Sequence, residues 1–462
     1  MSDKKIRLGV LPIKRSFLSL EVARDEKEKM YQVIRQIKPE ITEIIDIEDV
    51  CDSGILYKET DVNQVVNKFK KMEIDAIFLC HCDFGEESVA LHVLKRFQVP
   101  VLLWGNRDQY PNSFEKRGRD TQCGMFACSK VLIRNHIKFS YIYNTDVYSD
   151  EFSKGYENFL RVVNVVKTIR NIKIAQIGNR PQPFLSVIAN EGELMEQFGI
   201  ETVPIPVTDI IHNTKKCFEE NGEELQKWTK EAMTKFDCTS ESPDKIKMIQ
   251  ALAITIKKAM EEKDCAVGSL ECWSLFPKEL GIAPCMVISA LGDRKIPISC
   301  EMDLNGAFTM AIAKAIALDE EAVFLADLTI RHPKNDNAEL LWHCGPFPSV
   351  LCNPASKPGI VNAQGAWKLK NGNITILRCD ESEGNYQMLA VQGNAVDGPE
   401  TTGTYVWLEV ENLKRLEEKF ILGPYIHHVA GIYGDYTRAL KEATRYLNIK
   451  WDDIKEGWES LS

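Results

Sequence analysis

Strand-like and helix-like stretches alternate along most of this chain. Residues 6–13 form an apolar, β-rich run, and a charged stretch with helical spacing follows them. The alternation restarts at residues 173–178 and continues to a last apolar run at 322–330. Alternating strands and helices predict parallel sheets wrapped by helices. We therefore expect two doubly wound α/β domains, residues 1–170 and 171–330.

The character of the sequence changes after residue 330. Glycine, proline and asparagine become frequent, and short β-rich runs at 373–379, 386–393 and 403–410 follow without long helices between them. This pattern is typical of antiparallel sheets and small barrels. The expected fold class is α/β: two doubly wound parallel-sheet domains followed by a smaller C-terminal antiparallel β-barrel-like domain, residues 331–462. The 462 residues suit three domains, since one domain takes roughly 100–200 residues.

The charge balance argues against nucleic acid as a partner. The chain has 57 Lys and Arg against 67 Asp and Glu, a net charge of −10, whereas binding to phosphates needs a basic face. No run approaches the roughly 18 consecutive apolar residues of a membrane span. The apolar start of the chain ends at Lys14 and Arg15, so we expect a first strand there and not a signal peptide.

Most of the fourteen cysteines lie inside apolar runs, where cysteine behaves as a small hydrophobic residue. Without a secretion signal, reduced thiols and a cytoplasmic location are expected. Cys80 and Cys82 are spaced C-x-C, but no second pair completes a zinc-type spacing.

Several motifs of common enzyme classes are absent from the sequence. It has no G-x-G-x-x-G after a strand, no Walker loop, no G-x-S-x-G and no H-E-x-x-H. The sequence therefore gives no motif that would indicate a dinucleotide-binding protein, a nucleotide-binding protein or a serine hydrolase.

Two acids mark the segment 296–330, which has a strand–helix–strand pattern. Glu301 follows the first apolar run, and Asp327 ends the second. A β-α-β crossover usually places its strands parallel and close in one sheet, so both acids are expected at the same carboxyl edge. Neighbouring buried carboxylates are costly unless they are paired or bind a metal. The alternative is that each acid caps a helix or loop.

Three of the eight histidines lie at two Gly-Pro junctions. His343 precedes one such turn, and His427 and His428 follow the other. For each histidine alone, a core or capping role is the alternative to ligation. Together with the two acids they make an oxygen and nitrogen set that suits Mn²⁺ or a related divalent ion.

Four motifs occur in order between residues 301 and 429. They are E-M-D-L-N-G-A-F-T-M (301–310), F-L-A-D-L-T (324–329), W-H-C-G (342–345) and I-H-H-V (426–429). Their order and spacing, together with the three-domain organisation, resemble the L-fucose isomerase and L-arabinose isomerase superfamily.

The resemblance implies aldose–ketose isomerisation with a divalent metal, usually Mn²⁺. By motif, Glu301 and Asp327 match the two metal-binding carboxylates of the family, and His428 matches its C-terminal histidine ligand. His343 resembles the additional histidine ligand of the arabinose branch. The family also implies a homo-oligomer, commonly a hexamer, in which the first domain of a neighbouring subunit completes each pocket.

Candidate substrate-binding residues lie mainly in the first domain. The loop C-H-C-D-F-G-E-E (80–87) resembles a substrate-contacting loop of the fucose branch, which has an aromatic residue where this chain has His81. Arg15 and Asn106 follow strands at the expected sheet edge, where a surface role is the alternative. His427 completes this set. Trp273 follows another strand, and we expect it in the core, with a pocket wall as the alternative.

The expected function is metal-dependent aldose–ketose isomerisation of a free sugar, either L-fucose-like or L-arabinose-like or a modified hexose. The reaction moves a proton between C1 and C2 through an enediol, and two carboxylates can act as base and acid. We assign Glu301 as the proton-abstracting base, because its side chain reaches further than that of Asp327. The alternatives are a non-catalytic sugar-binding or sensing protein and a metal-assisted aldolase or hydrolase.

Overall fold

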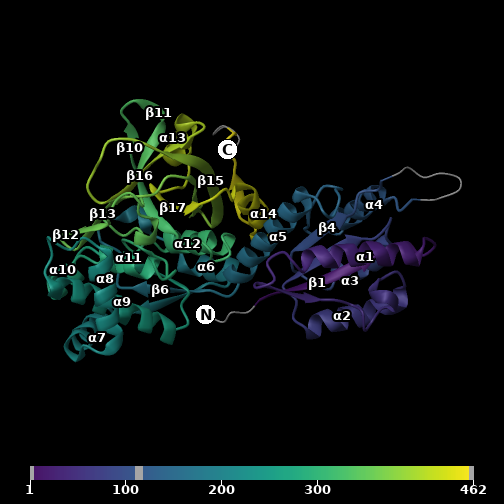
Figure 1. Cartoon of the computed structure of the whole chain (residues 1–462), viewed down its shortest axis with the longest axis horizontal. Helices are drawn as coiled ribbons and strands as arrows, with labels where there is room; N and C mark the ends of the chain where they lie inside the picture. The colour runs from purple at the N-terminus through teal and green to yellow at the C-terminus, as the bar shows by residue number, and fades with distance from the viewer. Residues whose placement is uncertain (1–4, 110–117, 457–462) are drawn as a thin grey trace. The chain divides into compact units, whose positions relative to one another are not determined.

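The computed structural model describes residues 5–109 and 118–456, which form two compact units that divide between Lys167 and Thr168 (Figure 1). The first unit is a five-stranded parallel sheet with strand order β2-β1-β3-β4-β5. Its strands are β1 (Ile6–Ile13), β2 (Thr42–Ile45), β3 (Ala76–His81), β4 (Val101–Gly105) and β5 (Ser140–Tyr141).

Helices cover both faces of this first sheet, as alternation along its strands requires. Leu8 and Val10 of β1 pack with α1 and α5 on one face, whereas Leu11 and Ile13 pack with the helices of the other face. The covering helices are α1 (Leu20–Ile34) and α5 (Asp150–Ile169) on one side, and α2 (Val62–Lys71), α3 (Glu87–Leu94) and α4 (Thr121–Arg134) on the other.

The second unit begins with a four-stranded parallel sheet in the order β7-β6-β8-β9. Its strands are β6 (Lys173–Ile177), β7 (Glu201–Ile205), β8 (Val267–Leu270) and β9 (Ile298–Ser299). The helices of this part are α6 (Glu191–Phe198), α7 (Val207–Glu220), α8 (Glu223–Lys235), α9 (Pro243–Glu262), α10 (Leu275–Leu280), α11 (Cys285–Gly292) and α12 (Leu304–Ile316).

The second unit ends in a closed barrel. Its six strands pair antiparallel in the order β16-β11-β10-β17-β14-β15, and β15 pairs again with β16. The barrel strands are β10 (Phe324–His332), β11 (Asn335–His343), β14 (Asn373–Ser382), β15 (Asn385–Val396), β16 (Thr404–Val410) and β17 (His428–Tyr433). Outside it lie β12 (Gly359–Val361), β13 (Gln364–Lys368), β18 (Lys450–Asp452), α13 (Leu413–Leu422) and α14 (Thr437–Leu447).

These sheets confirm the predicted fold class, but one strand lies elsewhere than expected. The apolar run 322–330, expected in the second parallel sheet, contains most of β10, and β10 pairs antiparallel with β11 and β17 in the barrel. A hairpin turn between His332 and Asn335 supplies β11 as an immediate antiparallel partner, so local pairing prevails over the crossover. Glu301 and Asp327 therefore do not share a sheet edge, and that prediction is wrong.

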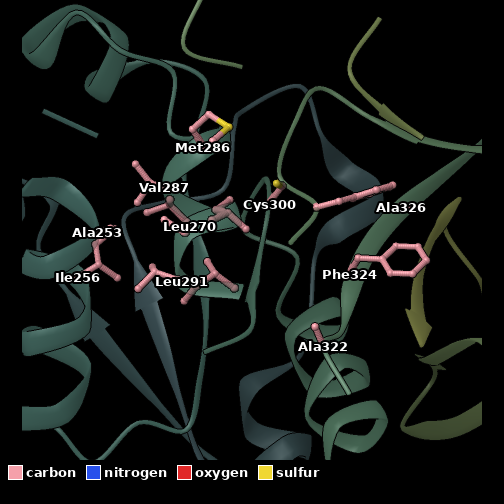
Figure 2. Packing of buried hydrophobic residues seen from close by; sticks show 14 of the residues in the cluster. Ala253, Ile256, Leu270, Met286, Val287, Leu291, Cys300, Ala322, Phe324 and Ala326 are labelled. Atoms are coloured by element: carbon pink, nitrogen blue, oxygen red, sulfur yellow. The ribbon is translucent and has the colours of Figure 1, made fainter. Parts of the chain in front are cut away.

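Helix α12 connects the second sheet to the barrel. It packs against β8 and β9 of the sheet and against β14 and β17 of the barrel (Figure 1). Its sequence is almost free of charge, and every residue from Leu304 to Ile316 except Lys314 is buried. Figure 2 shows the hydrophobic core that runs from the second sheet into the barrel, with residues of β8 and α11 lying between α9 on one side and Phe324 and Ala326 of β10 on the other. The second sheet and the barrel thus share one hydrophobic core.

Within the described ranges, no helix is both long enough and apolar enough to cross a membrane.

Candidate active site

A strained turn carries the first acid of the site. Between β9 and α12, Glu301 and Met302 both adopt left-handed backbone conformations, with φ of 62° and 59°. Each costs a non-glycine residue about 1–2 kcal/mol. The backbone N–H of Met302 donates to the carbonyl of Leu270 at 3.3 Å, and that of Asp303 to the carbonyl of Cys300 at 3.1 Å. Such strain is typical of functional sites, because the surrounding structure must hold it.

The other acids and two histidines converge on this turn. Asp327 of β10 lies directly opposite His428 of β17 in the barrel register. The Nε2 atom of His428 is 3.1 Å from Oε2 of Glu301 and 3.5 Å from Oδ1 of Asp327, and its Nδ1 is 2.8 Å from Oδ2 of Asp303. His343, the last residue of β11, places Nε2 3.9 Å from the same Asp327 oxygen. The four candidate metal ligands therefore lie together.

Three of the converging atoms are buried without a well-aligned hydrogen-bond partner. They are Oδ1 of Asp327 and the Nε2 atoms of His343 and His428. Buried polar atoms are normally satisfied, and carboxylate oxygens with imidazole nitrogens are ligands that Mn²⁺ and related ions accept. Atoms that Asp327, His427 and His428 can offer to an ion also lie within 4.8 Å of one another. The residues present fit a divalent metal.

The crowded carboxylates determine the protonation of the two buried histidines. Burial raises the pKa of Glu301, but interaction with His428 outweighs burial and brings that pKa below its usual range. Burial lowers the pKa of His428, yet the neighbouring carboxylates raise it to about 9. Burial likewise lowers the pKa of His343, and interaction with Cys344 and Asp327 raises it to about 10. The carboxylates thus favour positive charge at this place.

Aromatic side chains line the exposed side of Glu301. Trp273 is 49% exposed, and its indole N–H donates to Oε1 of Glu301 at 3.0 Å. The expectation of a core tryptophan is wrong, because β8 ends at Leu270 and Trp273 lies in the loop beyond it. Phe184 stacks on Trp273 at 5.7 Å and on the exposed His427 at 6.0 Å between ring centroids.

Phe184 and Asp303 are site residues that sequence reasoning missed. Phe184 follows two prolines in the loop after β6, a position that only the fold brings near Glu301. Asp303 lies within the E-M-D motif, two residues after Glu301. That spacing at the start of a helix was the signal available for it.

The remaining predicted residues belong to the first unit. His81 ends β3 and is buried; its Nδ1 lies 2.9 Å from the carbonyl of Phe84, and its Nε2 has no partner. Burial lowers the pKa of His81 to about 4, so the ring is neutral at pH 7. Arg15 pairs with Glu86 at 2.9 Å and lies over the ring of Phe84.

Asn106 is buried, and both ends of its amide are engaged. Its Nδ2 donates to Glu26 at 2.5 Å, and its Oδ1 accepts from the backbone N–H of Val147 at 3.1 Å. These bonds give Asn106 a structural role within the first unit.

Two family models match this chain. One is described as "Fucose/sulfoquinovose isomerase, N-terminal domain" and covers residues 9–170. The other is described as "L-fucose isomerase, C-terminal domain" and covers residues 359–455. The chain belongs to the fucose isomerase-like family.

Curated relatives of this fucose isomerase-like protein extend the match over nearly its whole length. A sulfoquinovose isomerase from Priestia aryabhattai is 26% identical over 95% of this chain and 97% of the relative. Proteins of the same name match from Alkalicoccus urumqiensis, at 24% identity over 82% of this chain and 86% of the relative, and from Clostridium sp. (strain MSTE9), at 23% over 93% and 95%.

Among solved structures, a periplasmic solute-binding protein from Actinobacillus succinogenes 130z with bound D-allose matches 68% of this chain and 90% of that chain. The identity is 14% and the TM-score 0.16, too low to bear on function. The family models and the curated relatives are all named as isomerases. The fucose isomerase-like protein is an enzyme, an aldose–ketose isomerase.

Proposed function

We propose that this isomerase acts on an aldohexose that carries an anionic group, of the sulfoquinovose kind, and depends on a divalent metal, with Mn²⁺ as the best candidate. Glu301, Asp327 and His428 would hold the metal, with His343 as a further ligand. The observation that carries the proposal is the set of buried oxygen and nitrogen atoms on Asp327, His343 and His428 that lack a well-aligned hydrogen-bond partner. The anionic substrate rests on the names of the curated relatives.

The chemistry needs one proton moved between C1 and C2 of the open-chain sugar. A divalent metal held by Glu301, Asp327 and His428 would supply Lewis-acid polarisation of the substrate. Glu301 removes the proton, because its Oε1 is oriented by the Trp273 N–H and its pKa below the usual range keeps it ionised. Asp327 serves as the second proton-transfer group. The Phe184–Trp273 pair offers an apolar wall for the sugar and limits the access of water.

A purified-protein assay tests this function. Metal-stripped enzyme is offered sulfoquinovose, L-fucose and L-arabinose with and without Mn²⁺, and ketose formation is read. Quinovose, which lacks the sulfonate, is the matched control for the anionic group. We expect Mn²⁺-dependent ketose formation from sulfoquinovose and much less from quinovose. Full activity after chelation would refute metal dependence.

The same assay separates the alternatives. Shorter carbon fragments would indicate an aldolase, and sugar binding without turnover would indicate a sensor.

We also propose a closed homo-oligomer, with a hexamer favoured, in the cytoplasm and without nucleic acid as a partner. The net charge of −10 supports the last point. The unpartnered Nε2 of His81 in the first unit supports a substrate-contacting role for that residue. Size determination in solution tests the assembly.

A further inference from the structure

Two acidic side chains and one arginine are buried next to His428. Asp303, Arg378 and Asp380 are 0%, 1% and 6% exposed. Arg378 donates to both oxygens of Asp303, at 2.5 and 3.1 Å, and to Oδ2 of Asp380 at 2.9 and 2.7 Å. Together with the ring of His428, these two carboxylates and one guanidinium form a buried cluster of ionisable groups. Buried charges are expensive to desolvate, so a hydrophobic core would serve stability equally well.

Asp303 links these charges to the candidate metal site. Its Oδ2 lies 2.8 Å from Nδ1 of His428, and its Oδ1 accepts from the backbone N–H of Gly306 at 2.8 Å, capping α12. A carboxylate without a proton only accepts, so Nδ1 of His428 must donate. The other ring nitrogen, Nε2, then faces Glu301 and Asp327.

The same carboxylate anchors the turn that carries Glu301. Glu301 lies two residues before Asp303, and Glu301 and Met302 are the two residues of this turn with left-handed backbone conformations. Gly306 leaves the room that this arrangement needs, since a Cβ there would lie 2.4 Å from Oδ2 of Asp303. Asp303 is therefore held by α12, β14 and β17 together.

We propose that Asp303 is a positioning residue, held in place by Arg378, which fixes the proton of His428 on Nδ1 so that Nε2 is directed at a divalent ion. The inference rests on the metal dependence proposed above. Loss of such a supporting carboxylate typically weakens metal binding about 10–100-fold.

Calorimetric Mn²⁺ titration of the metal-stripped protein provides the first test. The variant is Asp303→Asn, and the matched control is Asp380→Asn, which removes the same charge from Arg378 but does not touch His428. We expect Asp303→Asn to weaken Mn²⁺ binding about 10–100-fold and Asp380→Asn to leave it within about threefold of wild type. Equal losses in both variants, or an unchanged affinity in Asp303→Asn, would overturn the proposal.

A measurement on the wild-type chain covers the case in which the variants fail to fold. With ¹⁵N-labelled histidine, we expect the neutral ring of His428 to carry its proton on Nδ1, both in the metal-stripped protein at a pH high enough to remove the second ring proton and after loading with Mg²⁺ or Zn²⁺. A bare Nδ1 in either state would overturn the proposal. If wild type binds no divalent ion, the proposed metal-dependent function fails, whereas the Nδ1 proton still tests the role of Asp303.

Discussion

Glu301 and Asp327 have different surroundings, although both face His428. Oε1 of Glu301 accepts from the indole of Trp273, whereas Oδ1 of Asp327 is buried without a partner. An oriented carboxylate at a half-exposed aromatic wall suits proton transfer to a sugar, and an unpartnered buried oxygen suits a cation. The two acids therefore have related but unequal roles.

Neutralising either acid is expected to abolish most of the activity. Glu301→Gln and Asp327→Asn each remove a charge and a proton-transfer group at nearly constant volume, and the loss in kcat is about 10²–10⁴-fold. Steady-state kinetics measures the loss, and circular dichroism checks the fold. Folded variants with near-normal rates would show that other carboxylates carry the reaction.

Metal binding is expected to depend on pH through His428. Because the carboxylates raise the pKa of His428 to about 9, the metal-stripped site carries a proton on Nε2 at neutral pH. An ion must displace that proton, so the apparent affinity falls as pH falls below about 9. Calorimetry at pH 7.5 in buffers of different ionisation enthalpy measures the proton released. An affinity that is constant from pH 6.5 to 8.5 would contradict this linkage.

At the scale of elements, the sequence predicts where the strands lie better than it predicts which strands pair with each other. The apolar run around Asp327 was correctly predicted as a strand, but its pairing depended on the hairpin to β11. Glu301 and Asp327 come together because α12 packs the second sheet onto the barrel. Strand pairing between distant segments, as in β10 with β17, leaves no local pattern in the residues.

The protein is expected to lose stability as the pH rises, because of one glutamate on a barrel strand. Burial raises the pKa of Glu339 on β11 to about 7; Arg331 opposes this and Glu417 adds to it. The folded state then holds a proton more tightly than the unfolded chain. The contribution of Glu339 is complete below its ordinary pKa of 4.5 and is lost as the pH rises through 7.

Glu339→Gln removes this dependence, since glutamine stays neutral. We expect the variant to raise Tm relative to wild type at pH 8 and to change it little at pH 4.5. Thermal unfolding at both values measures the difference. An equal change in Tm at the two pH values would assign the effect to packing.

At the scale of the whole molecule, the order of two parallel sheets and a barrel followed from the periodicity of the runs and the change in composition. Closure of the barrel did not, since it depends on β15 pairing with both β14 and β16. His81 shows the same limit. Its motif indicated a substrate loop, but only the structure shows that the ring is buried with one nitrogen unpartnered.

Exchange of subunits tests whether His81 serves a neighbour's site. His81→Ala is expected to raise KM about five- to tenfold, the effect of one lost hydrogen bond, and to leave Mn²⁺ affinity unchanged. Mixing His81→Ala with Glu301→Gln subunits is expected to restore part of the activity, because a mixed interface joins an intact loop to an intact acid. A fully active monomer at assay dilution would refute the shared site.

The closed barrel has a consequence for how the chain opens in solution. β10 and β17 each pair with a neighbour on both sides: Asp327 lies between Trp342 and His428, and Gly431 lies between Phe324 and Ile376. The amides of Asp327 and Gly431 are therefore expected to exchange deuterium only when the barrel unfolds. Glu301, by contrast, follows a two-residue strand at the edge of the second sheet. We expect deuterium uptake at the turn of Glu301 before uptake at Gly431, so the acid assigned to proton transfer lies in a part of the site that opens more easily than the barrel.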